Sequence, residues 1–582
     1  MILQSLVRLF EDLVRNGKLS RPGWSHVKIS YALCLGMDGA LEYVVPQLHE
    51  VPSGKKTVLR PKMMNLPAPV TRSSGILPNF LWDNSSYLLG IDEKGKPQRS
   101  LSCFQACAQL HHQLLDQVSS PAATAILRFF DTWQPENARE HPALADTLEE
   151  ILKGGNLCFR VEGQFAQDDP LIQDAWSRHY NNIQGELQQC LVTGNLDVIE
   201  PVHPVIKGVN GAQSRGAAIV SFNAPAFCSY GKEQSLNAPV GKYAAFAYTS
   251  ALNYLLSDRD NVHRIGDTSI VCWAEGAQPE YSLLANFAIF GMEESPFSEA
   301  DLRAAVKSIA AGLPCAQMHL DPQRSFYILG LAPNAARLSV RFFYRNTFGQ
   351  FLRNVNAHHE RMKIVGSRYE FFPLWAMLRE TVNLNTSDKS PNPVLAGAVA
   401  RAIFSGTAYP AALLEATMLR IRAARNSTER NSANWKITPG RAAILKAYYL
   451  KNPSSQCPKE VLTVSLNPNS TNIPYTLGRL FAIYEAVQEA ANPGINSTIT
   501  DKYFNSAAAT PGIIFPILDN LCQKHLRKLE SGYRIFYDRQ IGQIKVILGE
   551  TYPLRLSLPE QGSFNLGYYH QKQARYTKKE EQ

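Results

Sequence analysis

The stretch SFYILGLAPNAARLSVRFFY, residues 325–344, decides the fold class of the first part of the chain. Two apolar and aromatic runs flank the short connection APNAA, which is the pattern of two paired strands and a turn. Upstream, GAAIVSFN (216–223) and SIVCWA (269–274) have the continuous apolar character of buried strands, and a helical pattern from Tyr243 to Leu256 separates them. Strands that alternate with helices predict a mixed α/β arrangement.

The same mixed pattern extends outward in both directions. Apolar residues recur at helical spacing from Leu3 to Val14, which predicts an amphipathic core helix. Asp38-Gly39 suits the positive φ angles of a tight hairpin turn. On the other side, Ser298 is placed to cap a helix, and a further helix is expected over 347–362.

Strand signals become sparse after residue 366. Helical patterns follow near 372–383, 393–404, 411–425, 439–451, 475–491 and 513–530. The Asn/Pro/Ser run NPNSTNIP (467–474) is typical of a linker before a last helical block. The sequence therefore predicts an α+β N-terminal domain over 1–365, a helical connecting region over 366–460 and an all-α helical bundle over 461–582.

Composition limits the class of protein. The chain has 582 residues and ten cysteines without a CxxC pair, so reduced thiols are expected rather than a secreted disulfide framework. Arg8 and Glu11 interrupt the apolar N-terminal segment, and no run reaches the roughly 18 uncharged apolar residues of a membrane span. We therefore expect a cytoplasmic protein. Its 59 Lys plus Arg exceed its 50 Asp plus Glu by nine, although only 19% of residues are charged.

Polar and basic side chains lie among glycines in three predicted loops. Glycines allow a backbone to approach a ligand, Lys and Arg neutralise phosphates, and Asn and Gln hydrogen-bond base edges, so these loops are candidate DNA contacts. The alternative for each is an ordinary connection in which Asn and Gln stabilise turns. The candidates are Arg72 in PAPVTRSSG, then Lys207, Asn210, Gln213, Ser214 and Arg215, and finally Lys232, Gln234, Asn237 and Lys242.

Two longer stretches are rich in cations and poor in acids. Between Arg337 and Lys363 the candidates are Arg341, Arg345 and Arg353, with aromatic residues between them. Between Arg420 and Lys451, a groove lined by Arg422, Arg425 and Lys446 is expected. Cations interleaved with aromatics suit a polynucleotide, while the alternative for each stretch is a solvated face.

Catalytic interpretations are weaker. Asp258, Asp260, His263 and Asp267 are of the types that hold a divalent metal in a nuclease, but a polar turn explains them as well. Cys103, Cys107 and His111 share one helix face without an evident fourth ligand, so a buried face is the simpler explanation. No GxSxG or HExxH motif occurs. We expect no enzymatic activity, no cofactor and no metal.

Several segments together resemble a known family, the large subunit of the type I-C CRISPR surveillance complex (Cascade). The resemblance spans nearly the whole chain. It is carried by LPNFLWDNSSYLLG (77–90), the long segment from VNGAQSRGAAIVSFN to ALNYLL (209–256), GDTSIVCWAE (266–275), LAPNAARLSVRFF (331–343), LGRLFAIYEAVQEAA (477–491) and QGSFNLGYYHQ (561–571).

The resemblance implies a non-catalytic subunit that recognises the protospacer-adjacent motif in duplex DNA, aids unwinding and holds the displaced strand. The implied partners are the crRNA-bound backbone and foot subunits, a small subunit, target DNA and a recruited helicase-nuclease, with no membrane. It further implies that the last helical block resembles the small subunit, which an internal translation start would also produce separately; Met418 is the last methionine. The candidate DNA contacts in this block are Arg479, Lys524, Arg527 and Lys528. The alternatives are a metal-dependent nuclease and a general RNA-binding scaffold.

Overall fold

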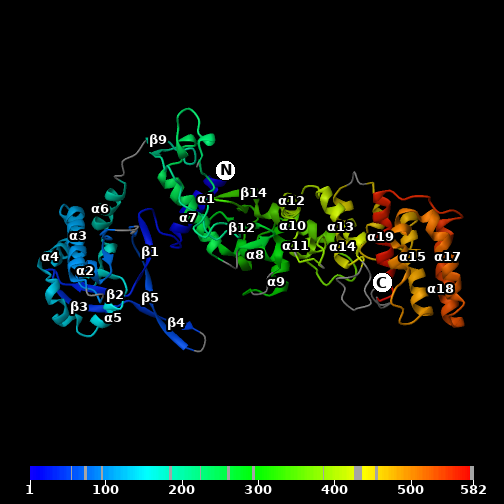
Figure 1. Cartoon of the computed structure of the whole chain (residues 1–582), viewed down its shortest axis with the longest axis horizontal. Helices are drawn as coiled ribbons and strands as arrows, with labels where there is room; N and C mark the ends of the chain where they lie inside the picture. Colours follow the sequence, from blue (N-terminus) through cyan, green and yellow to red (C-terminus); the bar gives the residue numbers. More distant parts are fainter. Residues whose placement is uncertain are drawn as a thin grey trace. The chain divides into compact units, whose positions relative to one another are not determined.

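Strands and helices share the N-terminal part of the chain, whereas the described part beyond β14 is helical (Figure 1). The computed structural model describes residues 1–53, 56–70, 75–93, 96–181, 187–222, 224–258, 262–291, 295–384, 386–387, 389–424, 436–452 and 456–576. Arg72, Asp260 and Arg425 lie outside these residues. The chain divides into two units, Met1–Pro204 with Val220–Leu252, and Val205–Ile219 with Asn253–Gln582.

The first unit combines helices with small sheets. Its helices are α1 (Ile2–Arg15), α2 (Ser85–Leu88), α3 (Pro97–Leu115), α4 (Pro121–Thr132), α5 (Leu148–Leu152), α6 (Pro170–Asn181) and most of α7 (Lys242–Ser257). Its strands are β1 (Trp24–Ile29), β2 (Tyr31–Leu35), β3 (Leu41–Pro46), β4 (Leu48–Ser53), β5 (Lys56–Pro67), β6 (Trp82–Asp83), β7 (Leu157–Val161), β8 (Gln164–Phe165), β9 (Leu187–Gln189) and β10 (Leu196–Val198).

A mixed sheet forms the core of this unit. Its strand order is β3-β2-β7-β6, with β8 paired to β7, and β2 runs parallel to β7. Leu33 and Phe159 from these strands are buried with Phe129 of α4. The predicted hairpin at Asp38-Gly39 is confirmed: β2 and β3 are antiparallel, and Gly39 has φ +85°. Strands β1-β5-β4 form a separate antiparallel sheet.

The amphipathic N-terminal helix is also confirmed. Leu6, Leu9, Phe10 and Leu13 of α1 are buried, as the helical spacing predicts. The aromatic ring of Phe10 packs edge-on against Tyr243 and Phe246 of α7. A helix therefore covers the apolar face that the sequence pattern identified.

The second unit begins with an antiparallel sheet in the order β11-β12-β13-β14. Its strands are β11 (His263–Ile265), β12 (Thr268–Ala274), β13 (Ser325–Asn334) and β14 (Arg337–Thr347). The predicted pairing across 325–344 is confirmed, with Ala335 at φ +52° in the turn. Alternate residues such as Cys272, Ile328 and Phe342 face a core that includes α8 (Pro279–Phe290), α9 (Glu299–Ala310) and α10 (Phe348–Met362). Ser298 caps α9, as predicted, and its Oγ accepts from the Asp301 amide at 3.2 Å.

The strand expected over 216–223 is wrong for the residues described there. Only single bridges form, between Ile206 and Ala217 and between Ala218 and Arg337. Gly216 has φ +102°, and the next two residues, Ala217 and Ala218, pair with different parts of the chain. Because consecutive residues of the apolar run do not pair with one neighbouring strand, the run does not form a β-ladder.

Helices occupy the described residues after Thr347, which confirms the predicted helical C-terminal region. They are α11 (Leu374–Arg379), α12 (Pro393–Ser405), α13 (Ala411–Ala423), α14 (Pro439–Lys451), α15 (Ile473–Ala491), α16 (Ile499–Ala509), α17 (Pro511–Leu526), α18 (Ser531–Leu548) and α19 (Leu558–Gln573), of which α16, α18 and α19 were not expected separately. None of the helices described is long and apolar enough to cross a membrane. One apolar core runs from Ile265 to Tyr569, so the predicted boundaries at 365 and 460 both fall inside this unit, and the division remains a prediction.

Two glycines bring α15 and α19 into backbone contact. A methyl group at Gly478 would overlap the carbonyl oxygen of Phe564 and lie 2.7 Å from the Tyr568 nitrogen. A methyl group at Gly567 would overlap the Tyr475 carbonyl oxygen. Because backbone atoms cannot move aside as a flexible side chain can, both positions require glycine.

This contact predicts opposite effects for two Gly→Ala substitutions in helices. Gly478→Ala should lower the free energy of unfolding by about 1–3 kcal/mol or more through overpacking. Gly542→Ala in α18, where a methyl group would meet nothing within 4 Å, should raise it by about 0.5–1 kcal/mol. Thermal unfolding midpoints of the two variants and the parent chain measure the difference. Equal midpoints for both variants would contradict the close approach of α15 and α19.

Candidate nucleic-acid interface

The glycine-rich loop 207–215 is anchored by its backbone and presents its polar side chains to solvent. Ile206 and Ala217 exchange backbone hydrogen bonds of 2.8 and 2.9 Å at its base. The Lys207 amide donates to Asn253 Oδ1 at 2.8 Å, and the Asn210 amide donates to Ser269 Oγ at 3.1 Å. Its side chains Lys207, Gln213, Ser214 and Arg215 are exposed, and Asn210 is half-buried.

Glycines allow this loop to pack closely. Gly208 has φ +89°, and a methyl group there would lie 3.0 Å from the Leu256 carbonyl oxygen. Beyond the loop, the Leu338 amide donates to the Ala218 carbonyl at 2.9 Å, and the Ala218 amide donates to the Ala336 carbonyl at 3.1 Å. The loop is thus tied to the start of β14, whose arginines are the next candidates.

On β14, Arg341 and Arg345 are both exposed, while Phe342 between them is buried in the core. Arg341 is ion-paired, its Nη2 lying 2.7 Å from Asp267 Oδ2. Arg345 makes no ion pair with any residue that the structure describes. Arg353 on α10 is exposed but held, since its Nε donates to the Ala310 carbonyl at 3.2 Å. The strand and the following helix therefore leave Arg345 as the most available cation.

The candidates at 232–242 belong to the first unit. Asn237 organises its own loop: its Oδ1 accepts from the Ser229 amide at 2.8 Å, and its Nδ2 donates to the carbonyls of Lys232 and Gln234, both at 2.9 Å. Lys232 and Gln234 have exposed side chains, and Lys242 begins α7 half-buried. Asn237 thus matches the turn-stabilising alternative, whereas Lys232 and Gln234 face solvent.

Of the three residues expected to line a groove between Arg420 and Lys451, Lys446 is buried and Arg425 lies outside the described residues. Lys436, Arg441 and Lys446 are buried, with 3–4% of their surface exposed. Lys436 Nζ donates to the Ala424 carbonyl at 2.7 Å, and Arg441 pairs with Glu380. Burial lowers the pKa of Lys446 to about 8. Arg422 is exposed and donates to Gln561 Oε1 at 2.9 Å. A count of cations along the sequence does not reveal burial, which is why this stretch resembled a surface stripe.

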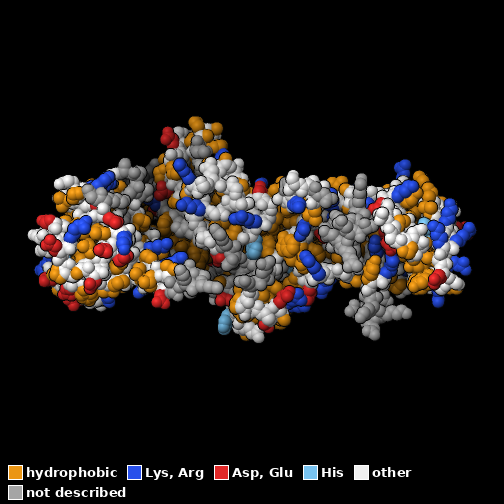
Figure 2. All heavy atoms as spheres, turned by 60° about the horizontal axis from the view of Figure 1, so that its bottom comes forward, with side chains coloured by type: hydrophobic (Ala, Val, Ile, Leu, Met, Phe, Trp, Pro, Cys, Tyr) orange, Lys and Arg blue, Asp and Glu red, His pale blue; other side chains and the backbone are white. Residues whose placement is uncertain are grey.

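The C-terminal candidates also divide into buried and exposed cations. Arg479 is buried in α15, donates to Gln571 Oε1 at 3.2 Å and to the Pro468 carbonyl at 3.0 Å, and has its pKa lowered by burial. Lys524, Arg527 and Lys528 at the end of α17 are exposed. Figure 2 shows Lys and Arg side chains gathered over α17 and α18 at the right-hand edge. Sequence reasoning missed the cations of α18, Arg534 and Arg539, which are exposed beside the exposed aromatic rings of Tyr533 and Phe536.

The candidate catalytic groups have structural partners. His263 stacks on Phe290 with ring centroids 3.9 Å apart, and burial lowers its pKa to about 4. His111 Nε2 accepts from the Leu81 amide at 3.0 Å, and its Nδ1 lies 2.8 Å from the Cys107 carbonyl. No group of three or more His, Cys, Asp or Glu is placed to hold a metal among the described residues. The arrangement favours the polar-turn and buried-face explanations.

The structure thus combines an α+β N-terminal part and a helical C-terminal part with exposed cations on a glycine-rich loop, a strand and two helices. The family model described as CRISPR-associated protein (Cas_Csd1) matches residues 6–576, so the chain belongs to that family. No curated protein matches the chain. The expected resemblance to a CRISPR large subunit is thereby confirmed at the level of the family.

Burial of Lys446 predicts a pH-dependent stability. The folded-state pKa of about 8 lies below the ordinary 10.5, so the unfolded chain binds more protons between these values, and the free energy of unfolding rises with pH across this window. Lys446→Met should therefore stabilise the protein at pH 7 by up to about 3 kcal/mol and by less at pH 10. Unfolding midpoints at both pH values test this, with exposed Lys524→Met as the control. A loss of stability at pH 7 in Lys446→Met alone would contradict it.

Proposed function

We propose that the chain is the non-catalytic large subunit of a crRNA-guided type I-C antiviral complex. The match of one CRISPR-associated family to residues 6–576 is the observation that carries this proposal. In RNA-guided systems base pairing reads the target, while protein reads only a short adjacent motif and holds the DNA backbone. The subunit accordingly recognises the protospacer-adjacent motif, aids unwinding and stabilises the R-loop, and it recruits a helicase-nuclease to the bound target.

Side chains of the second unit support two separate roles on DNA, the reading of bases and the binding of phosphates. Asn210 and Gln213 carry amides that suit base edges, and Arg215 and Arg345 carry charges that suit phosphates. The loop leads into Ala218, which is hydrogen-bonded to the start of β14, and Arg345 lies toward the other end of that strand. Lys524 near the end of α17, and Arg527 and Lys528 just beyond it, are exposed and would track a single strand by charge.

Motif reading and phosphate binding give different mutant signatures. In the crRNA-loaded complex, Gln213→Ala should reduce the affinity ratio between duplex targets with and without the adjacent motif. Arg345→Ala should lower the affinity for both targets by the same factor. It should also reduce the magnitude of the slope of log affinity against log salt by about 1. Equilibrium binding at two or more salt concentrations measures both effects, and Arg8→Ala, at an exposed arginine of α1, is the charge control. A wild-type complex indifferent to the motif would contradict the proposed function, and an unchanged ratio in Gln213→Ala would place the reader elsewhere.

A metal-dependent nuclease that uses Asp258, Asp260, His263 and Asp267 is the main alternative, and one of its three candidate carboxylates, Asp267, pairs with Arg341. We expect the purified chain to leave single- and double-stranded DNA intact in Mg²⁺ or Mn²⁺. Gel analysis of end-labelled DNA measures this. Cutting that disappears in Asp267→Ala and persists in Asp301→Ala would overturn the non-catalytic proposal.

A further inference from the structure

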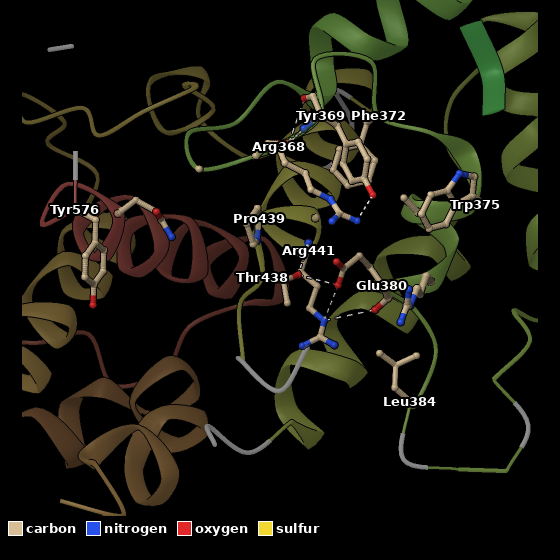
Figure 3. A pocket seen from close by; sticks show the side chains of 16 residues that line it. Arg368, Tyr369, Phe372, Trp375, Glu380, Leu384, Thr438, Pro439, Arg441 and Tyr576 are labelled. Carbon is tan, nitrogen blue, oxygen red and sulfur yellow. Dashed lines mark hydrogen bonds and ion pairs between the residues drawn. The ribbon is translucent and has the colours of Figure 1, made fainter. Parts of the chain in front are cut away.

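A cavity of about 690 Å³ opens in the second unit among the segment 366–372, α11, the start of α14 and the end of α19. Figure 3 shows Arg368 reaching toward Tyr369, with Trp375 on the far side and Glu380, Thr438 and Arg441 joined below. We call it the Arg/Trp pocket, after Arg368, Trp375 and Arg379 in its lining. It shares none of its lining with the loop or strand discussed above.

The aromatic wall of the pocket is held in place while one ring remains accessible. The Trp375 Nε1 donates to the Phe290 carbonyl at 3.2 Å, yet 43% of this residue's surface is exposed. Tyr369 packs edge-on against Trp375 with ring centroids 6.3 Å apart, and Phe372 supports Tyr369 at 5.0 Å. A fixed, exposed indole offers a flat apolar surface at little cost in side-chain entropy.

The charges in the pocket favour an anion. Among the described residues that line the pocket, the one acid is Glu380, and its carboxylate accepts from Thr438 Oγ1 at 2.7 Å and pairs with Arg441 Nε at 3.5 Å. Arg368 and Arg379 are exposed, and the Arg368 guanidinium lies 4.7 Å from the centre of the Tyr369 ring. Arg379 follows Trp375 by four residues, so both side chains share one face of α11.

We propose that the Arg/Trp pocket binds one unstacked nucleotide, with its base against Trp375 and its phosphate on Arg379 and Arg368. A flat ring beside two cations is complementary to a base joined to a phosphate, and aromatic stacking tolerates any base. An apolar ligand would desolvate the arginines without pairing them, and inorganic phosphate would leave the indole uncovered. This inference goes beyond the proposed function, which concerns target DNA. The pocket's chemistry fits a nucleotide within a strand and also a free nucleotide.

Calorimetric titration of the full chain with dAMP tests the pocket without the assembled complex. Trp375→Ala and Arg379→Gln should each weaken dAMP binding by about tenfold or more, whereas Arg8→Gln, at an exposed arginine of α1, should leave it unchanged. Deoxyribose 5-phosphate, which lacks the base, should bind weakly to the parent chain and be insensitive to Trp375→Ala. Trp375→Phe retains a stacking ring and should recover part of the affinity.

The outcomes distinguish the sources of the nucleotide. An adenine-containing trinucleotide that binds more tightly than dAMP and competes with it indicates a nucleotide within a strand, and equal affinities indicate a free one. Absence of dAMP and trinucleotide binding at millimolar concentration, or equal weakening by Arg8→Gln and Arg379→Gln, would overturn the proposal. Because no guide RNA or adjacent motif is involved, this result is independent of the test of motif recognition.

Discussion

The backbone contact between α15 and α19 is the constraint on which the helical part of the structure depends. With glycine at 478 and 567, the two helices approach until main-chain atoms touch, and α15 is buried along most of its length. This closeness places the buried carboxylate of Glu485 of α15 3.0 Å from the Nζ of half-buried Lys572 of α19. Burial alone would raise the pKa of Glu485, but Lys572 and hydroxyl donors including Thr500 hold it below its usual value. A buried charge so fully satisfied fixes the relative register of the two helices.

Burial also decides which of the chain's cations face solvent. Lys436, Arg441, Lys446 and Arg479 are enclosed, and most of them are hydrogen-bonded to carbonyl or carboxylate oxygens inside the second unit. The excess of nine positive charges is therefore not spread evenly along the two basic stretches. Among the sequence-predicted candidates of the second unit, the exposed cations lie on the 207–215 loop, on β14 and α10, and at Arg422 and the end of α17. The exposed candidates therefore do not form a continuous stripe along the sequence.

Local patterns predicted much of the fold because they depend on neighbours in sequence. The spacing from Leu6 to Leu13 defines α1, and the runs on either side of APNAA define β13 and β14. Prediction failed where distant partners decide. The apolar run at 216–222 lacks a continuous neighbouring strand, and Lys446 is buried by helices from far along the chain. The Arg/Trp pocket combines residues near 370, 440 and 575, so no local motif indicated it.

The unbroken apolar core from Ile265 to Tyr569 has a thermodynamic consequence. A sheet and a helical bundle that share one core lose their packing together, so they form a single cooperative unit rather than two independent folds. A ligand that binds only the folded form stabilises that entire unit by mass action, wherever on the unit it sits. A nucleotide bound in the Arg/Trp pocket and a strand bound at α17 would thus shift the same unfolding equilibrium. Each binding event would be registered by amide exchange in core segments that touch neither ligand.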